Sequence, residues 1–560
     1  MAVRGNLDHL SAQPANQRGI FPHWIDNQNP ILWDVGQPYL YTLESVLRID
    51  GVTRDVFRER FGFRDIRIAG RDFLLNGKKI RFRPTLPFHE VAVGGFRSAI
   101  AAQIDGFLAS HFNLAELWPN DHYERGRIIA RKAWADIADE KGFLLMYPAH
   151  TATAYVRQWK SPAVKERWRR ELVRQWKEIR NNPSVILLAA TPNRYAHIDD
   201  QNPRRIGNRR ALEGDAAWQR FTAPAREQLQ VIRAMDPSRP VAMHSGANLG
   251  DFQACNFYLN LLPLQEREEW FRFWVKSGDM PFMAVEFGTP FSYNFFRGRN
   301  GAFGAPASEP LLTEFCAASL GEKAYELERP QYRKMIRSFF VEKQQYRWMQ
   351  SHPEIVYAPA ALELQSLFIR NTLRSFRSWG VSGGVIPWEW GAGWQMKSGR
   401  RPLPAFRPGD RGWFQREADL FIFGLKDGAE ITLPGCELQA VNTPLLMYIA
   451  GEIHSFTEKG HLYYSGEKLC KSIALCNDER SKQEYRLSFE IVVNGKTIAD
   501  GRLTGSVPVG ESILLPLETE LPETAARTSG VIRVKGKFGK CDVFDEFHFS
   551  VYPVIRANFK

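Results

Sequence analysis

The sequence predicts an α/β protein in which a (β/α)8 TIM barrel is flanked by immunoglobulin-like β-sandwich domains. The length of 560 residues is too great for one hydrophobic core. Short apolar strands alternate with amphipathic helices in the middle of the chain, and strand signals alone occur nearer its ends. We expect an extended lead-in, a partial immunoglobulin-like domain, the barrel, a linker and a second sandwich, at 1–30, 31–70, 71–400, 401–428 and 429–560.

The first seventy residues change from loop-like to strand-like composition. Residues 1–30 are rich in Asn, Gln, Gly and Pro, which predicts extended chain. The turn signal Asp50-Gly51 lies among three alternating apolar stretches, which predict strands at 39–49, 55–61 and 65–68. These strands are too few for a complete sandwich, so either the lead-in contains a strand or sequence is missing. Exposed apolar surface on 31–70 should then favour aggregation or a homo-oligomer.

The central part of the chain repeats a strand-and-helix pattern. After the turn signal Asn76-Gly77, eight apolar runs predict strands at 80–83, 114–118, 143–147, 185–190, 241–244, 254–258, 282–286 and 383–388. Amphipathic periodicity predicts helices at 96–110, 127–141, 163–180 and 211–236. Eight strands with helices between them are what a (β/α)8 barrel requires.

The last part of the chain predicts a second sandwich. Residues 402–412 are rich in Pro, Arg and Gly and end the barrel. From about Ala429 only strand signals occur, at 445–450, 471–476, 485–493, 512–515, 530–534 and 546–551. The dipeptide Asn494-Gly495 is a strong hairpin signal between two of these strands.

Composition limits the partners that we expect. The formal charge is +12, but Lys and Arg are spread along the chain, which favours a solvated basic surface over a nucleic-acid site and leaves an anionic substrate open. The six cysteines lack metal-binding spacing, so we expect reduced thiols and no metal or other cofactor. No membrane helix or apolar signal region is evident, which predicts a cytoplasmic protein if the start is genuine and a periplasmic or secreted one if it is a fragment.

Glu286 is the residue at which we first expect chemistry. It ends a short apolar run between Pro281 and Gly288 that has the pattern of a fully buried strand. A carboxylate there faces a large desolvation cost, so it is either paired within the structure or part of a site at the carboxyl end of the strand.

Polar and aromatic residues also follow the other predicted strands. In a barrel these positions surround one cavity. They are His89 and Glu90, Trp118 to Asp121, Tyr147 and His150, Asn193 and Arg194, His244, Asn256 and Tyr258, and Trp388 and Glu389. Of these, His150 and His244 are interpreted as scaffold histidines.

A series of short motifs between residue 31 and about residue 395 resembles a known family. The motifs are Leu32-Trp33, Pro38-Tyr39-Leu40-Tyr41, residues 60–64, Leu75-Asn76-Gly77-Lys78, His89-Glu90, residues 138–142, residues 181–186, residues 236–240, Val285-Glu286-Phe287-Gly288 and residues 383–390. Their shared order is specific, and the chain resembles glycoside hydrolase family 2, which includes β-galactosidases, β-mannosidases and β-glucuronidases. That family has a jelly-roll domain before its immunoglobulin-like domain, for which this sequence has no room.

The resemblance implies a pair of catalytic carboxylates. Glu286 matches the family nucleophile, and the family has its acid/base in an Asn-Glu pair after the fourth strand. Here Asn193 is kept, but Arg194 stands in place of the acid, and a guanidinium cannot donate a proton near neutral pH because its pKa exceeds about 12. Arg194 could instead form an ion pair with Glu286. The carboxylates that could replace the acid are Asp199, Asp200, Glu116 and Glu389.

The resemblance also implies a substrate. Trp388 matches the aromatic residue on which the family stacks its sugar, Tyr258 matches a tyrosine beside the nucleophile, and His89 matches a histidine that contacts a sugar hydroxyl. With Asn193 and Glu389 these form the expected substrate-binding set. We expect a β-galactosidase-like retaining exo-β-glycosidase that removes terminal β-linked sugars from oligosaccharides or polysaccharide fragments. The alternative is a catalytically impaired relative that binds carbohydrate or serves a structural role.

Overall fold

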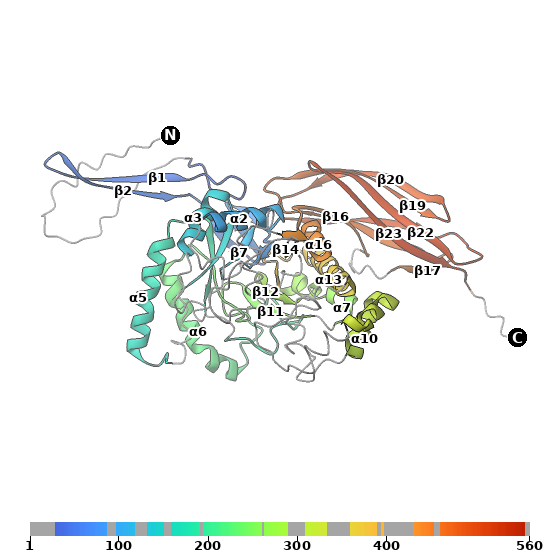
Figure 1. The fold of residues 1–560 in the computed structure, drawn as a ribbon, viewed down its shortest axis with the longest axis horizontal. Helices are drawn as coiled ribbons and strands as arrows, with labels where there is room; N and C mark the ends of the chain where they lie inside the picture. The colour runs from blue at the N-terminus through green and yellow to red at the C-terminus, as the bar shows by residue number, and fades with distance from the viewer. Residues whose placement is uncertain are drawn as a thin grey trace.

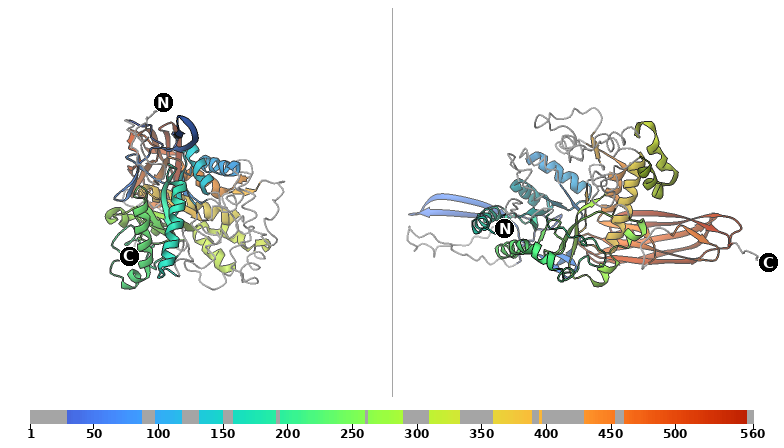
Figure 2. Two further views of the ribbon diagram at one scale, coloured as in Figure 1. Left: turned by 90° about the vertical axis from the view of Figure 1, so that its left-hand side faces the viewer. Right: turned by 90° about the horizontal axis from the view of Figure 1, so that it is seen from below.

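The computed structural model has a mixed α/β architecture, which confirms the coarse prediction of fold class. Figure 1 shows parallel strands and helices in the centre, a two-stranded hairpin at one end and long antiparallel strands at the other. The right-hand view in Figure 2 shows the same order along the long axis. The residues described are 29–86, 97–117, 131–149, 158–190, 194–259, 262–288, 309–332, 359–388, 394–396, 429–452 and 460–554. Residues 1–28 and the expected linker at 401–428 lie outside this set.

Eight parallel strands form two neighbouring sheets at the centre. The five-stranded sheet follows chain order and consists of β6 (Pro84–Thr85), β7 (Leu114–Glu116), β8 (Leu144–Pro148), β9 (Val185–Ala190) and β10 (Val241–Met243). The three-stranded sheet consists of β11 (Gln253–Phe257), β12 (Phe282–Gly288) and β13 (Val385–Trp388). The N–H of Phe82 donates a 2.8 Å hydrogen bond to the Ser382 carbonyl, so the segments that lead into β6 and β13 are adjacent.

Helices occupy most of the connections between these strands. They are α2 (Arg97–Ala109), α3 (Arg131–Lys141), α5 (Pro162–Ile179), α6 (Ala216–Met235), α7 (Leu264–Glu268), α8 (Arg272–Ser277), α10 (Glu309–Leu320), the 3-10 helix η3 (Gly321–Glu328) and α13 (Pro359–Ser378). Helix α6 begins later than the expected residue 211. The reason is its N-cap: the Asp215 carboxylate accepts a 2.8 Å hydrogen bond from the Trp218 N–H, which fixes the helix start.

Side chains along the parallel strands enter two separate apolar cores. One core packs against the helices and includes Leu145, Leu188 and Phe282. The other, which we call the inner core, draws on both sheets and contains Leu114, Met146, Ile186, Ala242, Ala254, Met283 and Val285. Phe73 and Leu75 of the small sheet described below join the inner core. The two parallel sheets therefore share one apolar core on the face away from the helices.

The N-terminal strands form two small antiparallel sheets. The hairpin of β1 (Tyr41–Ile49) and β2 (Val52–Phe61) turns at Asp50 and Gly51, whose φ angles of 51° and 76° suit a tight two-residue turn. Its side chains are largely exposed, with Leu47 at 56% and Phe57 at 60%. The second sheet contains β3 (Ile66–Ala69), β4 (Asp72–Leu75) and β5 (Lys78–Ile80).

The first parallel strand starts later than the sequence predicts. The expectation of a strand at 80–83 is wrong, because Ile80 ends β5, which pairs with β4 across the turn at Asn76 and Gly77. Both turn residues have positive φ, 53° and 74°, so the chain reverses there. The parallel strand β6 begins at Pro84.

The C-terminal part is a two-layer β-sandwich. One sheet contains β16 (Leu445–Ala450), β18 (Lys468–Asn477) and β21 (Ser512–Glu520). The other has the order β17 (Leu462–Tyr464), β23 (Cys541–Tyr552), β22 (Thr528–Phe538), β19 (Gln483–Val493) and β20 (Lys496–Val507). Both sheets contribute to one apolar core, through side chains such as Ile473 and Ile532.

The expectation that only strands follow residue 429 is wrong. After β15 (Ala429–Ile431), which pairs with β14 (Trp394–Met396), the chain forms α16 (Leu433–Asn442). Pro434 lies in the first turn of α16, where its missing N–H costs nothing. Leu438 and Val441 lie three residues apart on one face and pack into the core beneath the helices.

A buried cluster of charges joins the sandwich to the parallel sheets. Asp478 follows β18, and its carboxylate lies 3.1 Å from the Arg83 guanidinium and 3.0 Å from that of Arg377. Arg81 lies 4.0 Å away. Burial alone would raise the pKa of Asp478, but the three positive charges outweigh it and hold that pKa below its usual value. Beside this cluster Arg480 forms a 2.9 Å ion pair with Asp34.

Candidate active site

The strand that carries Glu286 has an extra residue in the middle of its ladder. Ala284 lies opposite Cys255 of β11, yet the next pair joins Glu286 to Asn256, so β12 uses two residues where β11 uses one. The pairing with β13 shows the same excess on β12. This is a β-bulge, a feature that changes the direction of side chains and is frequent beside active sites.

The bulge decides which way Glu286 points. Val285 faces the inner core, and simple alternation would then turn Glu286 toward the helices. Instead Phe287 packs on the helix side against Phe376, with ring centroids 6.4 Å apart. Glu286 is fully buried, and its carboxylate Oε2 accepts a hydrogen bond from the Tyr258 hydroxyl. The bulge therefore places Glu286 on the same side as Tyr258, at the carboxyl ends of the strands.

Tyr258 is itself held by the loop that follows β9. Its backbone N–H donates a 2.9 Å hydrogen bond to the side-chain Oε1 of Gln201. The Gln201 carbonyl in turn accepts a 2.9 Å hydrogen bond from the Trp270 indole. The position of the Tyr258 hydroxyl, and with it the orientation of the Glu286 carboxylate, thus depends on contacts between two connections, the one after β9 and the one after β11.

A second pair of polar side chains lies at the carboxyl ends of β7 and β10. Glu116 ends β7, His244 follows β10, and Glu116 Oε1 lies 2.6 Å from His244 Nδ1. Both side chains are fully buried. Each comes two residues after an inner-core residue, Leu114 and Ala242 respectively, so both point to the inner side. The pair therefore spans the inner space between two strands that are not neighbours in the sheet.

The sequence identified the members of these pairs but not all of their contacts. The structure brings Tyr258 and Glu286 together, two residues that the resemblance places side by side. His244 was interpreted as a scaffold histidine and Glu116 as a candidate acid, and their contact was not foreseen. The available signal was the period of two, because each lies two residues beyond an apolar position on its strand.

The other described candidates lie apart from the inner side. Arg194 is half-buried, and its charge and hydrogen bond lower the pKa of Tyr195 against the larger, opposite effect of burial. Asp199 forms a 2.7 Å ion pair with Arg205. Burial raises the pKa of Asp200 to about 7. Burial, and to a lesser extent the charge of Asp200, raises the pKa of the Cys255 thiol, which packs on the helix side of β11. Among the described replacement acids, Glu116 is thus the one on the inner side.

Several predicted residues cannot be placed. His89, Asn193 and Glu389 lie outside the described residues, as do Glu90, His150 and residues 118–121. Trp388 ends the backbone of β13, but its side chain is outside the described part.

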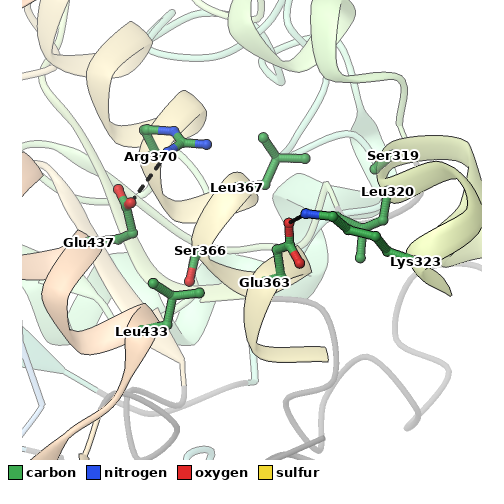
Figure 3. A pocket seen from close by; sticks show the side chains of 9 residues that line it. All are labelled: Ser319, Leu320, Lys323, Glu363, Ser366, Leu367, Arg370, Leu433 and Glu437. Carbon is green, nitrogen blue, oxygen red and sulfur yellow. Dashed lines mark hydrogen bonds and ion pairs between the residues drawn. The ribbon is translucent and has the colours of Figure 1, made fainter. Parts of the chain in front are cut away.

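A cavity of about 410 Å³ lies on the outside of the helices, away from the strand ends. Figure 3 shows its two ion pairs, Lys323 with Glu363 at 2.7 Å and Arg370 with Glu437 at 3.3 Å. Its lining comes from α10, η3, α13 and α16, through Ser319, Leu320, Lys323, Glu363, Ser366, Leu367, Arg370, Leu433 and Glu437. Because these charges already neutralise each other, we do not assign a function to this cavity.

Two further properties concern the described residues alone. None of their helices is long and apolar enough to cross a membrane. In the same part of the chain, no three His, Cys, Asp or Glu side chains gather as metal ligands would. All six cysteines lie in it and are free thiols.

Comparison with known proteins gives the class of the chain. Residues 8–64 match the family model described as glycosyl hydrolases family 2. A β-glucuronidase from Streptococcus agalactiae serotype V is 42% identical over 52 residues, 9% of this chain and 9% of that protein. A β-galactosidase from Thermoanaerobacterium thermosulfurigenes is 27% identical over 177 residues, 30% of this chain and 23% of that protein.

A solved structure extends the likeness in fold. The crystal structure of a β-D-mannosidase from Dictyoglomus thermophilum has a TM-score of 0.53 at 13% identity, covering 94% of this chain and 58% of that one. These similarities are all to glycosyl hydrolases, and the family match and the two relatives confirm the resemblance to family 2 inferred from the sequence motifs. The chain spans less than two thirds of the length of each of these proteins.

Proposed function

We propose that the chain is a retaining exo-β-glycosidase with Glu286 as its nucleophile. The observation that carries this proposal is the bulge in β12, which turns a fully buried carboxylate to the carboxyl ends of the strands beside the Tyr258 hydroxyl. The similarity to glycosyl hydrolases family 2 supports the chemical class. The substrates are terminal β-linked sugars of oligosaccharides or polysaccharide fragments, and the substrate preference is β-galactosidase-like.

The proposed architecture follows from the same features. The two parallel sheets are the eight strands of one (β/α)8 barrel, because their inner faces share one apolar core and the segments leading into β6 and β13 are joined by a hydrogen bond. The barrel extends over 71–400. An immunoglobulin-like part at 31–70 precedes it, and a sandwich of the same type at 429–560 follows the linker.

The mechanism has two steps. The Glu286 carboxylate attacks the anomeric carbon and forms a covalent glycosyl-enzyme, which water then hydrolyses with retained configuration. A negative charge close to the anomeric carbon also stabilises the oxocarbenium-like transition state. The Tyr258 hydroxyl holds the attacking carboxylate in one orientation. His89, Asn193, Trp388 and Glu389 bind the sugar in this proposal, with the Trp388 ring as stacking surface.

The test is turnover of aryl β-galactoside, β-mannoside, β-glucuronide and β-glucoside by the wild type and by Glu286→Gln. We expect one sugar to be hydrolysed and Glu286→Gln to abolish that activity. Glu171→Gln on α5, whose carboxylate pairs with Arg174 at the surface, is the matched control and should retain it. A 2-fluoro derivative of the sugar should trap the glycosyl-enzyme, and mass spectrometry should locate the label on Glu286.

Two outcomes would contradict the proposal. If folded wild-type protein turns over no substrate, the chain is instead a carbohydrate-binding or structural relative. If Glu286→Gln keeps wild-type turnover, or the label falls on another residue, Glu286 is not the nucleophile.

A further inference from the structure

The reaction proposed above needs a proton donor, and the described residues offer one arrangement for it on the inner side. We propose that His244 is the general acid and base of this site and that Glu116 positions it. This inference rests on the proposed function. It uses the 2.6 Å contact between His244 Nδ1 and Glu116 Oε1, the full burial of both side chains, and their position at the carboxyl ends of the strands.

Strand geometry places this pair and Glu286 on the same side and at the same end of the parallel strands. Glu116 lies two residues after the inner-core residue Leu114, and His244 lies two residues after the inner-core residue Ala242. Glu286 directly follows the inner-core residue Val285. The inner space of eight parallel strands is only wide enough for side chains to fill it. His244 and Glu116 meet across that space, and Glu286 enters the same space from the carboxyl end of β12.

The contact with Glu116 suits His244 to hold a proton. A buried carboxylate that accepts a hydrogen bond from Nδ1–H fixes the tautomer of the ring and stabilises the imidazolium, as in catalytic triads. The Nε2–H is then the group that can face a substrate. Of the other described titratable groups at these strand ends, Glu286 of β12 and the Tyr258 hydroxyl that contacts it lie on the inner side, and a carboxylate there favours a positive imidazolium.

The proton balance closes over the two steps. In the first, Glu286 Oε bonds to the anomeric carbon while the glycosidic bond breaks, and the leaving oxygen takes that bond's electron pair and the Nε2 proton. The aglycone departs as a neutral alcohol. In the second, neutral His244 takes a proton from water as its oxygen attacks the anomeric carbon, which restores the Glu286 carboxylate and the imidazolium.

The experiment compares two aryl glycosides of the sugar that the wild type hydrolyses, one with a phenyl and one with a 2,4-dinitrophenyl leaving group. His244→Ala should lower kcat/KM for the phenyl glycoside by about 10² to 10⁴-fold. The dinitrophenyl glycoside needs no proton, so its kcat/KM should change little. Sodium azide should occupy the space left by the ring, raise kcat of the variant on this substrate, and yield a β-glycosyl azide.

His197→Ala is the matched control, because His197 also pairs with a carboxylate, Asp215 at 3.2 Å, but at the start of α6. It should show no dependence on the leaving group and no azide product. If His244→Ala does not fold, Glu116→Gln carries the test: it keeps an oxygen for Nδ1–H but removes the charge. It should reduce phenyl glycoside turnover far more than dinitrophenyl glycoside turnover.

The inference would be overturned if a folded His244→Ala variant lost kcat/KM equally on both glycosides and formed no glycosyl azide. Equal losses of kcat/KM on both glycosides in a folded Glu116→Gln variant would overturn it as well. That result would leave Glu286 as nucleophile untouched. A wild type that hydrolyses neither glycoside would refute the proposed function itself, so the two failures are distinguishable.

Discussion

Removing the charge of Asp478 should loosen the junction between the sandwich and the parallel sheets. The Asp478 side chain is 1% exposed, and those of Arg83 and Arg377 are 8% and 9% exposed. In Asp478→Asn the volume is kept, but these arginines lose their counter-charge. Breaking a buried ion pair by removing one partner costs about 3 to 5 kcal/mol, and we expect a loss of this size in the free energy of unfolding at pH 7.

The loss should depend on pH in a defined direction. The pKa of Asp478 in the folded protein is depressed, so its stabilising contribution is fully present above the unfolded pKa of about 3.9 and disappears as the pH falls through the folded value. The difference between wild type and Asp478→Asn should therefore be constant from pH 5 to 8. It should shrink below about pH 4, because the protonated aspartic acid resembles asparagine.

Guanidinium denaturation followed by circular dichroism and tryptophan fluorescence would measure this loss. No tryptophan follows Trp413, so fluorescence reports on the part of the chain before the sandwich, whereas circular dichroism reports on the whole. Asp542→Asn is the control, because Asp542 pairs with Lys537 at 2.8 Å on the surface and should change little. An Asp478→Asn variant as stable as the wild type at pH 7, or a difference that persists at pH 2, would refute the reasoning.

Three further predictions use features outside the proposed catalytic groups. Arg267 is fully buried, its guanidinium carbon lies 3.6 Å from the centroid of the Phe368 ring, and its guanidinium makes no hydrogen bond among the described residues. Burial lowers its pKa to about 9, so Arg267→Met should raise the free energy of unfolding by about 1 to 4 kcal/mol. A variant with a lower free energy of unfolding than the wild type would contradict this prediction. Burial raises the pKa of Asp200 to about 7, so stability should fall as pH rises from about 4 through that value. Asp200→Asn should remove this fall and be the more stable protein in melts at pH 8, and parallel pH profiles would contradict the assignment. Replacing the exposed Leu47 and Phe57 of the hairpin with threonine should reduce the self-association that we expect of the wild type, and an unchanged mass in sedimentation would exclude the hairpin as its cause.

The sequence predicted best those elements whose pattern is local and long. Strands β9 and β12 are continuous apolar runs buried on both faces, and such runs are typical of parallel sheets. Strand β6 contains only Pro84 and Thr85, too few residues for any period to show. Helix α16 was missed because its burial depends on helices distant in sequence, which local propensity cannot report.

The candidate site shows the same limit at the level of single residues. Strand ends were enough to select Glu286, Tyr258, Glu116 and His244, because a period of two and a terminal position can be read from the chain. The sequence did not indicate which of these four side chains contact one another. Glu116 and His244 are 128 residues apart in sequence, and their contact depends on the sheet order. The direction of Glu286 depends on the register of β12 against both of its neighbours.

The extra residue in β12 has a consequence for how variation in this strand is interpreted. The register of β12 against both neighbouring strands depends on the number of residues between Ala284 and Phe287, more than on which residues they are. A scan of point substitutions would therefore miss this dependence. Deleting Val285 would leave every functional group in the chain and let Ala284, Glu286 and Phe287 alternate regularly opposite Cys255, Asn256 and Phe257, so the carboxylate would keep its inward direction. A single deletion would thus show what the site does without the bulge.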